Sequence, residues 1–157
     1  ETARSTPVQT MTGVDTVVTM DWTTLILKTD GTAWGAGSNH QGQLGLGFNG
    51  GDTPTPAQIM TDVSAVSGGG NHSLFLKTDG TLLAAGYNWY GQLGNGTDSN
   101  SPTPVQVSTG VVSCAAGSGH TVFVKADGSA WAAGNNQFNQ LGDGSQEDQL
   151  SPVTVNQ

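Results

Sequence analysis

The chain has few basic residues, few charged residues of any kind and one cysteine. Four Lys plus Arg stand against twelve Asp plus Glu, which gives a formal net charge of −8 at pH 7. Binding to nucleic acid depends largely on Lys and Arg neutralising phosphates, and an anionic membrane surface repels an acidic protein. We therefore expect no nucleic acid and no membrane among its partners. The lone Cys114 also excludes an intrachain disulfide.

Long apolar runs and helical patterns are absent as well. No apolar run approaches the roughly 18 residues of a membrane-spanning helix. No window of about eleven residues places apolar side chains at helical spacing without an interrupting Gly or Pro. Gly occurs 24 times and charged residues make up only 10% of the chain, so most polar side chains are uncharged. This composition is common in secreted β proteins, and we expect an extracellular or cell-surface location.

The sequence repeats three times at a step of about 48 residues. The dipeptide Asp30-Gly31 returns as Asp79-Gly80 and Asp127-Gly128, at spacings of 49 and 48. A proline recurs at almost the same spacing, at Pro7, Pro56, Pro104 and Pro152. Phased on that proline, one domain (1–157) contains units at about 7–55, 56–103 and 104–151, followed by a duplicated strand at 152–157.

The middle of each unit predicts a β-hairpin. The segments are TTLILKTDGTAWGAG (23–37), HSLFLKTDGTLLAAG (72–86) and HTVFVKADGSAWAAG (120–134). β-branched and aromatic residues favour strands, and Asp-Gly between them is typical of a type I′ turn, which needs positive φ at both central residues. The chain is therefore expected to be all-β. Short strands at this period fit β-propeller blades, small sheets that bury their faces only against neighbouring blades.

The repeated pattern H-x-L-x-L-x-x-D-G-x-x-x-A-x-G-x-N-x-x-G-Q-L-G resembles the regulator of chromosome condensation (RCC1-like) repeat, and the resemblance covers essentially the whole chain. Members of that family usually form seven-bladed propellers. Three repeats therefore imply a partial propeller or part of an oligomeric one. The nucleotide-exchange and nucleosome-binding activities of particular members are not implied, because this acidic chain lacks a basic patch.

Several conspicuous residues are explained by structure. His72 and His120 align with Thr23, so the three repeats do not supply three equivalent histidines for a metal or catalytic site. Their rings are expected to form hydrogen bonds with nearby backbone. The aspartates of the Asp-Gly pairs belong to hairpin turns. Cys114 lies in a Val-rich strand and is expected to be a small buried apolar side chain.

GLGFNG (45–50) lacks the strand and helix of a nucleotide site, and DGSQED (143–148) lacks the spacing of a calcium loop. We expect no enzyme activity, no catalytic residues, no metal and no cofactor.

The candidate partner-binding residues occupy positions that vary between the repeats. Between the fixed glycines and the fixed Gln-Leu-Gly triplets, the third unit has Asn135 where the second has Tyr87 and the first has Ser38. A core position would not exchange Tyr for Ser, so these side chains are expected to project from loops on one rim. The candidates are Trp22, His40, Tyr87, Trp89, Tyr90, Gln137 and Phe138. By contrast, Trp34 and Trp131 align with Leu83 in a strand and are expected to pack between blades.

Three functions remain open at this stage. The first is a non-enzymatic protein-interaction module that presents aromatic and polar loops. The second is a self-assembling structural protein, a homo-oligomer built through open blade edges and the duplicated terminal strand as a closed ring or a filament. The third is a carbohydrate-binding propeller, in which Trp89 stacks on a sugar while Asn88 or Gln137 forms hydrogen bonds with it.

Overall fold

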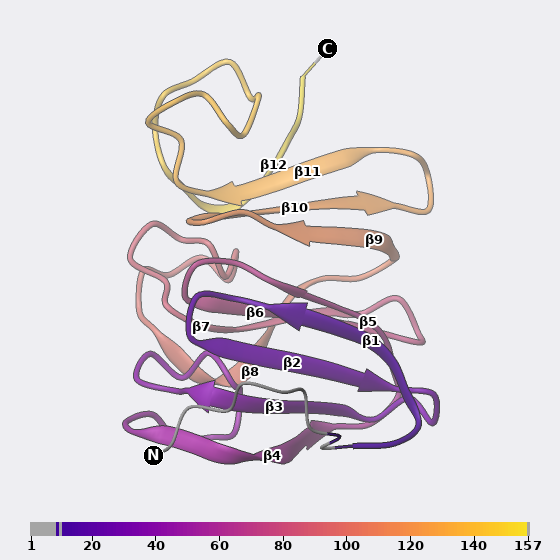
Figure 1. Ribbon diagram of the computed structural model, residues 1–157. Coiled ribbons are helices and arrows are strands. Elements are labelled where there is room, and N and C mark those ends of the chain that lie inside the picture. Colours follow the sequence, from indigo (N-terminus) through magenta and orange to yellow (C-terminus); the bar gives the residue numbers. More distant parts are fainter. Residues whose placement is uncertain (1–8, 10, 157) are drawn as a thin grey trace.

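The computed structural model describes residue 9 and residues 11–156. It consists of three four-stranded antiparallel sheets that follow one another along the chain (Figure 1). The first sheet contains β1 (Val14–Thr19), β2 (Thr23–Lys28), β3 (Ala33–Ser38) and β4 (Asp52–Met60). The second contains β5 (Val63–Gly68), β6 (His72–Lys77), β7 (Leu82–Gly86) and β8 (Ser101–Ser108). The third contains β9 (Val111–Ala116), β10 (His120–Lys125), β11 (Ala130–Gly134) and β12 (Gln149–Thr154).

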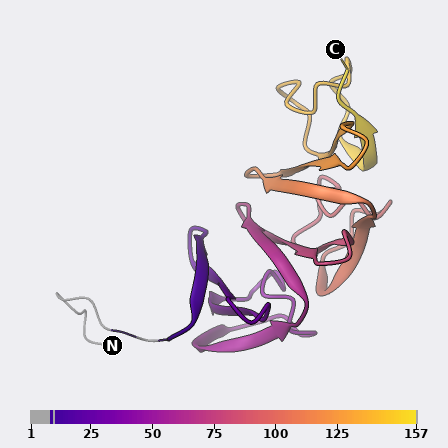
Figure 2. The same ribbon diagram turned by 90° about the vertical axis from the view of Figure 1, so that its right-hand side faces the viewer.

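The three sheets are arranged as blades along an arc (Figure 2). The first strands of the blades lie on the inner side, where β1 contacts β5 and β5 contacts β9. Each sheet then continues outward in chain order to its fourth strand. The all-β partial propeller expected from the repeat is therefore confirmed for the described residues.

Alternate side chains of β6, the second strand of the middle blade, are buried against the two neighbouring blades. Phe75 packs towards the first blade, while Leu74 and Leu76 pack towards the third. The core between blades one and two contains Leu25, Leu27, Ala33, Leu44, Val63, Val66, Phe75 and Ala85. The core between blades two and three contains Leu74, Leu76, Leu82, Ala84, Leu93, Val111 and Phe123. Each blade is thus stabilised chiefly by its neighbours.

The central hairpins form where expected, but their turns are not type I′. Among the described residues, only Asp62 and Asn139 have positive φ without being glycine, so the Asp of each Asp-Gly pair does not. In the first hairpin the Gly31 N–H donates to the Lys28 carbonyl at 2.9 Å, and only Gly31, with φ of 78°, is left-handed. This is a type I turn closed by a glycine bulge. The Asp30 carboxylate accepts the Thr32 N–H at 3.0 Å, which explains the aspartate.

The proline-containing segments form the fourth strands. Pro56 lies in β4, Pro104 in β8 and Pro152 in β12, each at the outer edge of its sheet, where a missing N–H is tolerated. Strand β12 pairs with β11 of the same chain, so its residues complete the third blade rather than stand as an additional strand. The matching segment around Pro7 lies outside the described residues. No helix in the described part of the chain has the length and apolar character to span a membrane.

Candidate functional site

One edge of the three blades carries all the long loops, and we call it the loop rim. It consists of three short turns after the first strands (20–22, 69–71 and 117–119) and three long loops before the fourth strands (39–51, 87–100 and 135–148). In Figure 1 the long loops lie on the left and the hairpin turns on the right. We call the opposite edge, with the Asp-Gly turns, the hairpin rim. All seven candidate residues lie on the loop rim.

A buried asparagine holds each long loop in shape. The side chain of Asn88 accepts the Leu93 N–H at 2.8 Å and donates to the carbonyls of Thr97 (2.8 Å) and Ser99 (3.1 Å). Asn39 and Asn136 are equally buried and accept the N–H of the aligned leucines at 3.0 Å. The fixed Asn and Leu of the repeat are thus a loop clamp, a role that the sequence analysis missed although the alignment of these residues pointed to it.

The first two long loops also dock on the next blade. The Gly47 N–H donates to the Pro102 carbonyl at 2.9 Å, and one repeat later the Gly96 N–H donates to the Leu150 carbonyl at 2.8 Å. The Thr121 hydroxyl of blade three donates to the Gln92 carbonyl of blade two at 2.7 Å. The loop rim is therefore a continuous surface built on fixed backbone.

The aromatic candidates divide into exposed and half-buried side chains. Trp22, Trp89 and Phe138 are 81%, 70% and 84% exposed. Tyr87 and Tyr90 are half-buried and pack edge to face, with ring centroids 6.3 Å apart. Tyr90 also lies against Gly119 of the third blade and lines a hollow there. The expectation that all three aromatics of the second loop project outward therefore fits Trp89, whereas the tyrosines partly support the blade interface.

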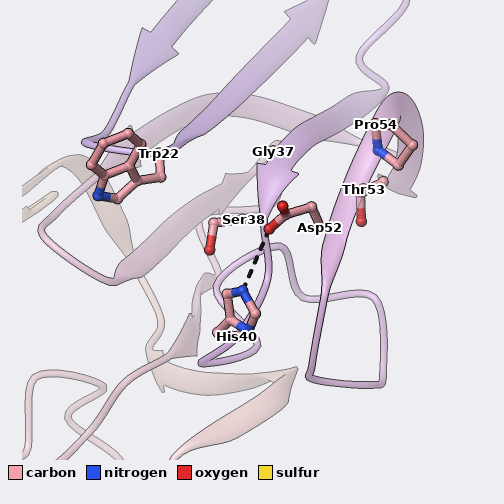
Figure 3. A pocket seen from close by; sticks show the side chains of 7 residues that line it. All are labelled: Trp22, Gly37, Ser38, His40, Asp52, Thr53 and Pro54. Carbon is pink, nitrogen blue, oxygen red and sulfur yellow. Dashed lines mark ion pairs between the residues drawn. The ribbon is translucent and has the colours of Figure 1, made fainter. Parts of the chain in front are cut away.

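Trp22 and His40 meet at a hollow of about 560 Å³ on the first blade (Figure 3). Its remaining lining residues are Gly37, Ser38, Asp52, Thr53 and Pro54. Nε2 of His40 lies 3.5 Å from Oδ1 of Asp52, and both side chains are largely exposed. Gln137 and Phe138 line a second hollow of about 420 Å³ together with Tyr90 and His120. The structure thus places five of the candidates at two hollows, while Tyr87 and Trp89 line neither of them.

The combination of Ser38, His40 and Asp52 does not form a catalytic relay. Nδ1 of His40 accepts the Gly51 N–H at 3.4 Å, while Nε2 faces Asp52. Neither ring nitrogen is then placed to take a proton from a serine hydroxyl. Within residues 9 and 11–156, no group of three or more His, Cys, Asp or Glu side chains is arranged to hold a metal ion.

The side chains of His72 and Cys114 lie at the interface between blades two and three. His72 is buried, and its Nε2 bonds the Thr121 hydroxyl of the next blade at 3.0 Å, not nearby backbone as the sequence suggested. Burial lowers the pKa of His72 to about 4, with a further lowering from His120. Cys114 packs against the second core, and burial raises the pKa of its thiol to about 11, which keeps it protonated and unreactive at neutral pH.

The two tryptophans expected between blades differ in their environments. Trp131 packs against the core between blades two and three, as expected, and Lys125 Nζ lies 4.7 Å from its ring centroid. Trp34 is half-buried on the face of blade one that points away from blade two, and Lys28 Nζ lies 6.0 Å from its ring centroid.

Three four-stranded sheets that pack face to face around inner strands, each with the same Asn-clamped loop, define a repeat protein of the β-propeller class. The chain belongs to the regulator of chromosome condensation (RCC1) repeat family, whose family model matches residues 30–76, 79–124 and 127–157. A second model of the same repeat matches residues 63–92 and 111–140.

Solved structures show the same fold. The structure of yeast RCC1 (Prp20) bound to Kap60 matches with a TM-score of 0.83 at 22% sequence identity, covering 92% of this chain and 37% of the yeast chain. Prp20p from Saccharomyces cerevisiae gives the same score and identity, covering 92% and 39%. Human WBSCR16 matches with a TM-score of 0.81 at 24% identity, covering 91% and 39%. This chain therefore spans less than two fifths of the length of these proteins. No curated protein matches it in sequence.

Proposed function

We propose that the chain is a non-enzymatic protein-interaction module whose loop rim contacts a partner protein. The observation that carries the proposal is the exposure of three large aromatic side chains, Trp22, Trp89 and Phe138, on one rim. Aromatic side chains are enriched among the residues that dominate binding energy at protein interfaces. The proposed setting is extracellular or at the cell surface, in line with the uncharged polar composition.

The construction of the loops supports this role. Buried Asn39, Asn88 and Asn136 fix the loops from within, and each of the first two loops is docked on the next blade. A surface that is already ordered loses little conformational entropy on binding, which favours affinity. The yeast relative binds Kap60, and its binding to Gsp1p and histones has been characterised. Protein binding thus occurs on this fold.

The carbohydrate alternative is weaker in its original form. It named Asn88 or Gln137 as the residue that bonds a sugar beside Trp89, but Asn88 is fully buried and its amide group bonds the loop backbone. Gln137 and Trp89 are exposed, and Gln137 lines a hollow to which Trp89 does not contribute.

Capture followed by measurement with pure proteins tests the proposal. The tagged chain is used to capture proteins from extracts and culture medium of the source organism, and an identified partner is then titrated by calorimetry. The test variant combines Trp22→Ala, Trp89→Ala and Phe138→Ala. The matched control combines Val14→Ala and Val112→Ala, which remove exposed apolar side chains from strand ends at the hairpin rim. We expect the test variant to bind at least about tenfold more weakly. Equal weakening by both variants would refute a role for the loop rim.

Self-association is a second candidate, favoured by the uncovered outer faces. Five of the six residues of β1 are exposed, and His120, Val122 and Val124 of β10 are only half-buried, whereas the aligned residues of β6 are buried. Another blade or a second copy would cover such faces. Light scattering at micromolar concentration tests this directly. A dimer or a concentration-dependent ladder supports self-association, and a folded species of 16.0 kDa contradicts it.

A further inference from the structure

Positive and negative charges are distributed unequally over the two rims. The described lysines, Lys28, Lys77 and Lys125, each end a second strand at the hairpin rim. On the loop rim, the part of the chain that the structure describes has no Lys or Arg. That rim carries Asp21, Asp52, Asp98, Asp143, Glu147 and Asp148. The exposed aromatic side chains therefore lie on a surface whose Asp and Glu side chains are negatively charged, and such a surface attracts cationic groups.

The hairpin rim shows how this chain binds a cation with its own residues. Lys28 Nζ lies 3.6 Å from the Asp30 carboxylate and 6.0 Å from the centroid of the Trp34 ring. A cation is thus held between a carboxylate and an aromatic face, two interactions that add to each other.

The hollow on the first blade presents the same two chemical groups without a lysine or arginine of the described chain. Trp22 lines one side, and Asp52 with His40 lies across from it (Figure 3). The Asp52 side chain is 70% exposed and its contact with His40 is solvent-exposed, so that contact is weak and readily replaced. A guanidinium or ammonium group entering the hollow would meet an aromatic face and a carboxylate together.

We propose that this hollow binds the cationic side chain of an Arg- or Lys-bearing segment of the partner protein, with Trp22 stacking on it and Asp52 pairing with it. The inference rests on the proposed function and specifies the chemistry of the partner. The second long loop also contains an exposed aromatic side chain and an acidic one, Trp89 and Asp98, and the third long loop contains Phe138 and Asp148. The segment is accordingly rich in Arg and Lys rather than singly charged.

The test is an NMR titration of the full chain with a defined probe. The probe is the blocked peptide acetyl-Ser-Arg-Gly-Arg-Ser-amide, and the control probe replaces both arginines by citrulline, which has nearly the same shape without the charge. We expect the arginine peptide to shift the Trp22 indole N–H and the backbone signals of residues 38–40 and 52–54. The citrulline peptide is expected to bind at least about tenfold more weakly, because charge-assisted bonds and stacking are both diminished.

Matched variants separate this site from general attraction to an acidic protein. Asp52→Asn removes the carboxylate at the hollow. Asp62→Asn removes a carboxylate on the hairpin rim that is similarly exposed (69%) and also lies beside a basic side chain, 3.6 Å from Lys77 Nζ. Trp22→Ala is paired with Phe48→Ala, which removes another exposed aromatic from the same rim. We expect Asp52→Asn and Trp22→Ala to weaken binding about three- to tenfold and the two controls to change it less than twofold.

Three results would overturn the inference. They are equal effects of Asp52→Asn and Asp62→Asn, signal shifts spread over acidic residues of both rims, and binding of neutral oligosaccharides with no binding of the arginine peptide. The outcome is distinct from that of the proposed function. If the loop-rim variant loses a protein partner while Asp52→Asn keeps it, the interaction module stands and the cation site does not.

Discussion

His72 in the second blade and Thr121 in the third are joined by a buried hydrogen bond of 3.0 Å. The Thr121 hydroxyl donates its own proton to the Gln92 carbonyl, so it accepts from His72, and the ring carries its proton on Nε2. Nδ1 is buried, and no hydrogen-bond partner reaches it within the described residues. A second proton would therefore create a buried N–H without an acceptor, in addition to a buried charge.

Stability should consequently depend on pH between about 6.5 and about 4. The unfolded chain takes up the His72 proton near its ordinary pKa of 6.5, while the folded chain resists it down to about 4. Stability is then complete above pH 6.5 and decreases by up to about 3 kcal/mol as the pH falls through this window. His120, whose pKa is also lowered by burial, acts in the same direction. Urea unfolding at pH 7, 6, 5 and 4.5 measures the change.

The control for this prediction is His72→Gln, which removes the titrating group. The variant should be less stable at pH 7 and should lose most of the pH dependence. A variant that keeps the parent slope would show that other groups cause it. The hairpin-turn aspartates contribute mainly below this window. Their ordinary pKa is 3.8, and hydrogen bonds from Thr32, Thr81 and Ser129 lower the pKa values of Asp30, Asp79 and Asp127 further in the folded chain.

Gly69 and His72 should behave as a coupled pair. A Cβ on Gly69 would overlap the His72 ring and the Gly117 carbonyl. In blade one, Met20 aligns with Gly69 and Thr23 aligns with His72. That blade therefore has a side chain at the glycine position and no imidazole ring opposite it. We expect Gly69→Ala to destabilise the fold by about 2 to 4 kcal/mol. Combined with His72→Thr, it should cost at least about 1 kcal/mol less than the sum of the single changes, as determined by chemical denaturation. Simple additivity would contradict the coupling.

Removal of the loop clamp should be costly even though it touches no core side chain. Asn88→Ala leaves the Leu93 N–H and the Thr97 and Ser99 carbonyls without their partner. We expect a loss of about 2 to 4 kcal/mol, since each buried unpaired group costs about 1 to 3 kcal/mol. The comparison is Asp98→Ala in the same loop, an exposed position where we expect a change within about 0.5 kcal/mol. Similar melting temperatures for the two variants would argue against the clamp.

Trp89 and Tyr90 should respond differently to replacement by the residues of blade one. Trp89→His places an exposed side chain where His40 stands in the first repeat, and we expect a change within about 0.5 kcal/mol. Tyr90→Gln removes a ring that contacts Tyr87 and Gly119, and we expect a loss of about 1 to 2 kcal/mol. Thermal melts of the two single variants decide the matter. A larger loss for Trp89→His would reverse the assignment.

The sequence predicted the blades well because their determinants are local and repeated. Asp30 and Gly31 mark the hairpin by themselves, and the period marks its neighbours. The predicted turn type was wrong because Asp-Gly occurs both in a type I′ turn and in a type I turn with a bulge, and the loop length decides between them. Lys28 pairs with Thr32 around a three-residue loop, which takes the bulged form. Exposure within the variable loop was only partly predictable. Trp89 and Tyr90 are adjacent in sequence, but one faces solvent and the other faces the next blade, a contact from a distant part of the chain.

The forward docking of the loops sets an order of events during synthesis on the ribosome. The Gly96 N–H needs the Leu150 carbonyl, 54 residues later, so the second loop stays incomplete until the third blade has emerged. Its internal clamp at Asn88 closes within residues 88–99 and can form earlier. The second blade can thus form in two stages, first by itself and then on contact with the third blade. A nascent chain stalled after the second blade would expose the Gln92 carbonyl, which in the complete chain accepts a hydrogen bond from the Thr121 hydroxyl. That unpaired carbonyl is the acceptor to which the third blade binds when it is synthesised.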